Sequence, residues 1–206
     1  NNTGAVDSEG GLIYATPDKI QDKESGQITY FDFDLYGTIT GCSVQTSLIY
    51  AVNTNLAFDI GPKASITGNT CKQLCYHNTA GNDLNIYGNV SGNTCKYSVF
   101  NGQNGGYNVT LYDGAKVNDN VVTGEGGVFN FGANRNIIMQ EGSEICRNTV
   151  ANGALITTFG EGNCFHMEGG TISGNTVENG GLFGFSSGSW KRCSVFELQG
   201  GTITDN

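Results

Sequence analysis

Acidic side chains recur at regular intervals along this 206-residue chain. Asp113, Glu141 and Glu168 are spaced by 28 and 27 residues, and Asp32 and Asp59 lie 27 residues apart. Carboxylates stacked on neighbouring strands could hold Ca²⁺, which takes about six to eight oxygen ligands. A solvated acidic face is the alternative, because two like charges about 4.8 Å apart in water repel by only roughly 1 kcal/mol. We predict no metal and no other cofactor, and these five carboxylates are the candidates if Ca²⁺ does bind.

Cleavage of an acidic polysaccharide would need other residues. A hydrolase requires clustered aspartates beside a histidine and a basic residue, and a lyase requires a Ca²⁺-binding aspartate cluster with an arginine or lysine base. The chain contains two histidines, His77 and His166, and no Asp-Asp pair. We place both histidines on separate repeats as turn or surface residues, so substituting His77 should change little. The sequence therefore predicts no catalytic residues and no enzyme.

Seven cysteines are many for a cytosolic protein of this size, and they lack the paired CxxC spacing of a zinc site. Cys71 and Cys95 occupy the same position of consecutive repeats. On adjacent strands their Cα atoms would lie about 4.8 Å apart, which permits a disulfide. Two buried free thiols are the alternative. An odd number of cysteines leaves at least one thiol free or bonded outside the chain.

Sequons and charge bear on the compartment and the partners. Asn89 and Asn108 begin N-x-S/T sequons and are candidate glycosylation sites. Together with the cysteines they favour an extracellular or cell-surface location. A formal net charge of −9 disfavours nucleic acid and anionic membranes as partners, and no apolar run approaches membrane-spanning length.

A repeated phrase must position all these residues. Its copies are GTITGC, SITGNTC, NVSGNTC, KVNDNVV, EICRNTV, TISGNTV and TITDN. We call one residue of each copy the marker residue. The marker residues, spaced by 24 to 31 residues, are Cys42, Asn69, Asn93, Asn120, Asn148, Asn175 and Asn206. A period of this length in a chain rich in Gly, Asn and Thr indicates stacked supersecondary units.

Apolar residues recur at fixed places around each marker residue. The position three residues before it is always β-branched and aliphatic: Ile39, Ile66, Val90, Val117, Ile145, Ile172 and Ile203. A second column lies two residues after it: Val44, Cys71, Cys95, Val122, Val150 and Val177. A third column follows five or six residues later: Ile49, Tyr76, Phe100, Val128, Leu155 and Leu182. Alternating apolar pairs also precede each copy, so each repeat supplies about three short strands.

These columns predict an all-β fold, a right-handed parallel β-helix of about seven to eight rungs, each rung being one repeat of 24–31 residues. We expect residues 1–206 to form a single continuous β-helix segment. Both ends of the chain fall at the same phase of the repeat and neither resembles a polar cap, so we expect the segment to belong to a longer array.

The recurring asparagines Asn69, Asn93, Asn120, Asn148 and Asn175 are predicted to form a structural ladder. Asparagine tolerates the left-handed backbone of a sharp turn, and stacked amides can hydrogen-bond along the stack. We prefer this interpretation to a ligand-binding role.

One repeat, ISGNTVENGGLF at Ile172–Phe183, resembles the repeats of chlamydial polymorphic outer-membrane proteins and related surface proteins of bacteria and protists. In that family an F-x-x-N motif precedes a GGA[ILV] motif. The matching pieces here are Ile172–Asn175 with Gly180–Leu182, Ile145–Asn148 with Gly153–Leu155, and Val117–Asn120 with Gly126–Val128. Ile or Val replaces the first Phe, and the Ala is often absent. The resemblance implies a β-helical passenger or ectodomain in adhesion or surface structure, and it carries over no catalytic residue.

We therefore expect a structural or adhesive β-solenoid segment of a large secreted or cell-surface protein, with a filament as one form of assembly. Its partners would be neighbouring repeat segments or copies, and a glycan or host-surface ligand. The alternative is a carbohydrate-binding or polysaccharide-cleaving β-helix whose active site is weak or lies outside this segment.

Overall fold

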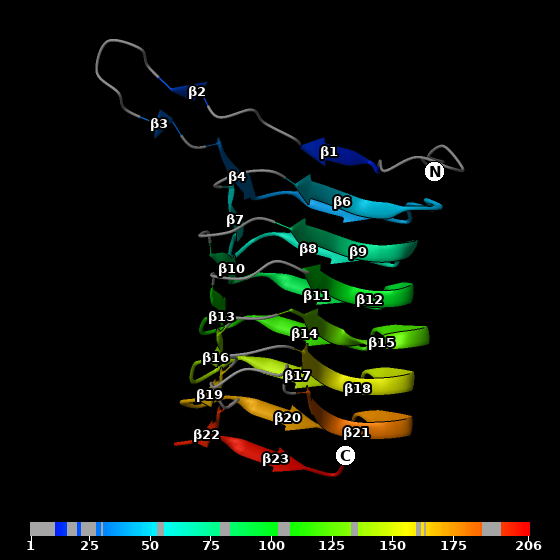
Figure 1. The fold of residues 1–206 in the computed structure, drawn as a ribbon, viewed down its shortest axis with the longest axis vertical. Helices are drawn as coiled ribbons and strands as arrows, with labels where there is room; N and C mark the ends of the chain where they lie inside the picture. The colour runs from blue at the N-terminus through cyan, green and yellow to red at the C-terminus, as the bar shows by residue number, and fades with distance from the viewer. Residues whose placement is uncertain are drawn as a thin grey trace.

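The computed structural model describes residues 11–15, 20–21, 28–29, 31–52, 56–78, 83–102, 108–132, 136–159, 162, 164–186 and 195–206. Every regular element in these ranges is a β-strand. The strands form three seven-stranded parallel sheets and one antiparallel pair, β2 (Ile20–Gln21) with β3 (Ile28–Thr29). Equivalent strands lie one above another along the long axis (Figure 1). The fold is a parallel β-solenoid, as the sequence predicts.

Successive strands of the chain enter the three sheets in rotation. The first sheet holds β4 (Phe31–Leu35), β7 (Leu56–Ile60), β10 (Leu84–Ile86), β13 (Asn108–Leu111), β16 (Asn136–Met139), β19 (Cys164–Met167) and β22 (Val195–Leu198). The second holds β5 (Thr38–Thr40), β8 (Ser65–Thr67), β11 (Asn89–Ser91), β14 (Lys116–Asn118), β17 (Glu144–Cys146), β20 (Thr171–Ser173) and β23 (Thr202–Thr204). The third holds β1 (Ile13–Ala15), β6 (Ser47–Val52), β9 (Thr70–Asn78), β12 (Thr94–Gly102), β15 (Val121–Phe131), β18 (Thr149–Phe159) and β21 (Thr176–Ser186).

The second sheet shows why such short strands are stable. Each of its strands has three residues, and the β-branched central residue points inward while Thr, Ser, Asn, a charged residue or, in β17, Cys146 flanks it. The register places all seven predicted central residues in one column, from Ile39 to Ile203. One inward residue per strand is enough because the column continues through the neighbouring turns of the solenoid.

The third sheet departs from the predicted pattern. Two consecutive residues of each long strand are inward, and the structure aligns Ile49 with Cys75 and Phe100. Tyr76 lies one step further on, half-buried, and stacks on Tyr50 with ring centroids 5.2 Å apart. The predicted third column was therefore wrong in two respects. Tyr76 lies outside the inward pair, and because Phe100 aligns with Phe129, the residues Val128, Leu155 and Leu182 fall one position before the column of Ile49 and Phe100. The cause is a set of register shifts, since the strands carry different numbers of residues between the marker residue and the inward pair.

Large apolar side chains fill the space between the sheets. Phe58, Phe100, Phe129 and Phe165 are essentially inaccessible to solvent. Phe100 and Phe129 stack with ring centroids 5.1 Å apart, the offset expected when equivalent residues repeat on adjacent strands. The core is thus a continuous column, and each turn of the chain depends on its neighbours to bury its own apolar face.

Ile145→Asp tests this inward assignment. Ile145 is fully buried at the centre of β17, so the variant would place a carboxylate in the core without a partner. We expect loss of the native fold in the surrounding turns, with a free-energy cost of several kcal/mol. Thermal melting followed by circular dichroism measures it, and Val121→Asp, at a position 36% exposed, is the control. Wild-type melting of Ile145→Asp would contradict the assignment.

Candidate functional site: the asparagine ladder and its surroundings

A left-handed turn follows each strand of the second sheet and directs the marker residue inward. Four of these turns use glycine with φ of 63° or 64°: Gly41, Gly68, Gly92 and Gly174. Three others place a charged residue in the same conformation, with φ of 57° at Asp119, 56° at Arg147 and 54° at Asp205. A side chain in this region of φ/ψ space is strained unless its surroundings hold it.

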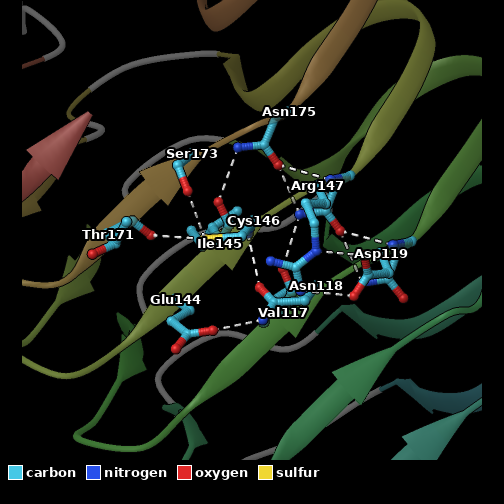
Figure 2. A network of polar contacts seen from close by, with 12 residues as sticks. Val117, Asn118, Asp119, Glu144, Ile145, Cys146, Arg147, Thr171, Ser173 and Asn175 are labelled. Carbon is cyan, nitrogen blue, oxygen red and sulfur yellow. Dashed lines mark hydrogen bonds and ion pairs between the residues drawn. The ribbon is translucent and has the colours of Figure 1, made fainter. Parts of the chain in front are cut away.

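The five predicted asparagines lie directly after these turns, and each is at most 3% exposed. From Asn93 to Asn175, each amide oxygen accepts two hydrogen bonds from the asparagine one turn earlier. Asn93 Nδ2 and the Asn93 backbone N–H, for example, donate to Asn120 Oδ1 over 2.9 Å and 3.1 Å. Each Nδ2 also donates to a backbone carbonyl of the second-sheet strand one turn earlier, as from Asn120 to Val90 of β11 over 2.9 Å. Figure 2 shows the same contact between Asn175 and Ile145.

This network occupies the hydrogen-bonding groups of each asparagine side chain. Both Nδ2 hydrogens have acceptors in all five, and from Asn93 to Asn175 both lone pairs of Oδ1 have donors, while Asn69 Oδ1 has one donor. The amides are therefore saturated by the protein itself, and the arrangement holds consecutive turns together. At the first marker position, the Cys42 backbone N–H donates to Asn69 Oδ1 over 2.9 Å, and at the last, Asn206 Oδ1 accepts from Asn175.

A polar network borders the ladder, with an exposed ion pair and the buried side chain of Asn118, and sequence analysis did not identify it (Figure 2). Arg147 donates from both Nε and a terminal nitrogen to the carboxylate of Asp119, over 2.8 Å and 2.9 Å. This hydrogen-bonded pair raises the pKa of Arg147 above its ordinary value. Beside it, Asn118 donates to Glu144 and accepts from the backbone N–H of Cys146, both over 2.8 Å. The one available signal was that Asp119 and Arg147 occupy a position that is glycine in other repeats.

Of the candidate carboxylates Asp113, Glu141 and Glu168, only two are aligned on neighbouring strands. Leu111, Met139 and Met167 are in register in the first sheet. Asp113 and Glu141 each lie two residues after this column, whereas Glu168 lies one residue after it. The prediction that all three stack was therefore wrong for Glu168, because the turn that follows Met167 is one residue shorter.

The other two candidate carboxylates, Asp32 and Asp59, are not aligned with each other. The register aligns Asp59 with Asp34 and places Asp32 beside Ala57, so Asp32 and Asp59 do not share a position. The connection from β4 to β5 is shorter than the one from β7 to β8. Residues at the same sequence distance from their marker residues therefore lie at different positions in these two strands. Asp59 accepts a hydrogen bond from Asn85 over 2.8 Å. Within the described residues, no three His, Cys, Asp or Glu side chains converge as metal ligands would.

The two histidines lie in different sheets. His77 is 1% exposed in β9, so its prediction as a turn or surface residue was wrong, and its substitution would disturb the core. β9 has fewer residues between the marker residue and its inward pair than the neighbouring strands have. Tyr76 therefore lies outside that pair, and the side chain of His77, the next residue, is buried. His166 is half-buried on the outer side of β19, where its Nδ1 lies 2.7 Å from Glu197 Oε2.

Cys71 and Cys95 are in register on β9 and β12, and their sulfur atoms lie 3.7 Å apart as unbonded thiols. The hydrogen bond between Cys95 and Cys71, together with burial, raises the pKa of Cys95 well above its ordinary value. Burial raises the pKa of nearby Cys75 to about 12. These groups stay protonated at neutral pH, so they react slowly as nucleophiles. The disulfide stays a prediction.

The two sequon asparagines are both half-buried in strands. Asn89 begins β11 and lies beside Lys116 of β14. Asn108 begins β13, and its Oδ1 accepts a hydrogen bond from Asn136 over 2.8 Å. A glycan on Asn108 would replace an amide that participates in this cross-strand contact. Glycosylation at either position stays a prediction.

Comparisons with protein-family models, with curated proteins and with solved structures find no match for this chain. In the part of the chain that the structure describes, no helix has the length and apolar character needed to cross a bilayer.

Asn120→Ala tests the ladder. The variant removes the acceptor of two Asn93 donors and the donor to Val90, and it leaves these groups buried. We expect a loss of about 3 kcal/mol in the free energy of unfolding, because each unsatisfied group costs about 1–3 kcal/mol. Urea denaturation followed by circular dichroism measures the loss. Asn179→Ala is the control, since Asn179 forms similar but exposed contacts, and equal losses would contradict the role of the ladder.

Mild oxidation tests the cysteine pair. With oxidised glutathione, the Cys71 and Cys95 thiols should lose two electrons to form a disulfide, while glutathione is reduced. The rate should rise with pH, because the raised pKa of Cys95 keeps its thiolate scarce near neutrality. Mass spectrometry of unreduced peptides identifies the bridge, and Cys71→Ser is the control. A Cys95 that remains free after exhaustive oxidation would contradict the pairing.

Proposed function

We propose that the chain is a structural and adhesive β-solenoid segment of a large secreted or cell-surface protein. In this proposal the solenoid is right-handed, with about seven to eight rungs of 24–31 residues. Its partners are neighbouring repeat segments or further copies, and a filament is one form of the assembly. Its surface also meets a glycan or a host-surface ligand.

The saturated asparagine ladder is the observation that carries the proposal. The most regular polar residues of the chain, from Asn69 to Asn175, hold one turn to the next and have no free hydrogen-bonding group for a substrate. Such an arrangement supports a rigid scaffold whose faces are free to vary. The resemblance to the repeats of polymorphic outer-membrane proteins supports the same role, and cysteine content and sequons support the extracellular compartment.

We propose no enzymatic activity for this chain. The alternative is a carbohydrate-binding or polysaccharide-cleaving β-helix whose active site is weak or lies outside these residues. Depolymerisation of a polysaccharide by the chain would favour this alternative.

Imaging the protein isolated from its source by cryo-electron microscopy tests the proposal. We expect right-handed rungs that pack in register against further repeats or copies, with glycans on Asn89 or Asn108. Peptide mass spectrometry of the same material checks the glycans independently. An isolated particle with a carboxylate-lined groove holding an ion, from material found inside the cell, would contradict both the role and the location.

A further inference from the structure

A shallow hollow lies on the outer side of the third sheet, where β9 and β12 begin. Its volume is about 350 Å³, within the range of ligand sites. The nearly buried Val44 and Cys71 contribute apolar lining. The polar lining comes from Ser43, Gln45, Thr70, Lys72, Lys96 and Tyr97. The lining includes no asparagine of the ladder and no candidate carboxylate.

Two lysines are neighbours at this hollow. Cys71 and Cys95 are in register, so Lys72 and Lys96, which follow them, lie on adjacent strands about 4.8 Å apart along the stack. Both side chains are exposed. Within the described ranges, the ion pairs involve Lys116, Arg147 and His166, and none involves either of these lysines. Two neighbouring ammonium groups thus form no ion pair on a chain of net charge −9.

A single tyrosine holds both ammonium groups. The Nζ atoms of Lys72 and Lys96 lie 5.4 Å and 5.3 Å from the centre of the Tyr97 ring, within the distance of cation–π attraction. Tyr97 lies within a β-bulge, since β12 has one more residue than β9 between Cys95 and Ser98. Bulges commonly re-aim a side chain beside a binding site. The bulge and the ring together keep two like charges side by side.

The lining specifies the chemistry of a ligand. Two ammonium groups would donate charge-assisted hydrogen bonds to a carboxylate or sulfate. The Gln45 amide and the Ser43 and Thr70 hydroxyls could exchange hydrogen bonds with sugar hydroxyls, and the apolar lining suits the C–H face of a sugar ring. The acidic remainder of the chain would repel long polyanions such as nucleic acid.

We propose that this hollow binds an anionic oligosaccharide, with Lys72 and Lys96 as the charge-recognising residues and Tyr97 as a positioning residue. The proposal deepens the adhesive part of the proposed function, because it names the class of ligand. It leaves the role of the solenoid as a scaffold untouched.

Isothermal titration calorimetry with defined tetrasaccharides tests the proposal. We expect tetragalacturonate or a sulfated galactan tetrasaccharide to bind, and their relative affinities distinguish a carboxylated from a sulfated source. Methyl-esterified tetragalacturonate, which has the same backbone without the charges, should not bind. Lys72→Gln/Lys96→Gln should weaken binding at least about tenfold, as expected for the loss of hydrogen bonds from charged donors.

Matched variants separate recognition from general charge. Lys63→Gln/Lys116→Gln removes two positive charges elsewhere and should change affinity less than about twofold. Tyr97→Leu should weaken binding, whereas Tyr97→Phe keeps the ring face and should restore it. Circular dichroism establishes that each variant is folded.

Three results would overturn the proposal: equal binding of the esterified ligand, equal loss in the control double variant, or no binding of either anionic tetrasaccharide by the native chain. In each case a chain that remains folded leaves the scaffold role standing. Failure of the scaffold role would instead be seen in the assembly and location of the isolated protein.

Discussion

The hydrogen bonds between buried asparagine amides are the constraint on which this solenoid depends. A buried amide without partners is costly, and each asparagine here finds its partners only on adjacent turns of the chain. The asparagines of consecutive turns must therefore lie directly above one another, whatever the length of the connections between them. The repeat varies from 24 to 31 residues, yet the column from Ile39 to Ile203 stays in register. The marker residue resets the alignment once in every turn.

The parts of the structure near the marker residue were predictable from the sequence, and the distant parts were not. The β-branched column and the Cys71–Cys95 alignment lie within three residues of it, where every repeat has the same length. Glu168 and Asp32 lie beyond a turn or a connection whose length changes between repeats, so counting from the marker residue misplaced them. Tyr76 was misplaced by register shifts in the third sheet.

The same variable regions give the solenoid its individual surface features. The extra residue of β12 brings Tyr97 beside two lysines, and the repeated phrase contains no signal of that contact. A change of residue type next to the marker residue has a similar effect, since Arg147 and Asp119 form an ion pair where charged residues replace glycine in a left-handed turn. A fixed interior and a variable exterior are what a repeated scaffold needs if its faces are to differ from turn to turn.

The direction of the asparagine ladder has an electrical consequence. Every ladder oxygen, from Asn69 to Asn206, accepts from the turn before it, so all these side-chain amides point the same way. Amide dipoles of about 3.5 D that align head to tail add along their axis. The solenoid therefore has a polar axis, with the negative end of each dipole toward the first turn, whatever its net charge. Two solenoids lying side by side would attract one another more strongly when their chains run in opposite directions.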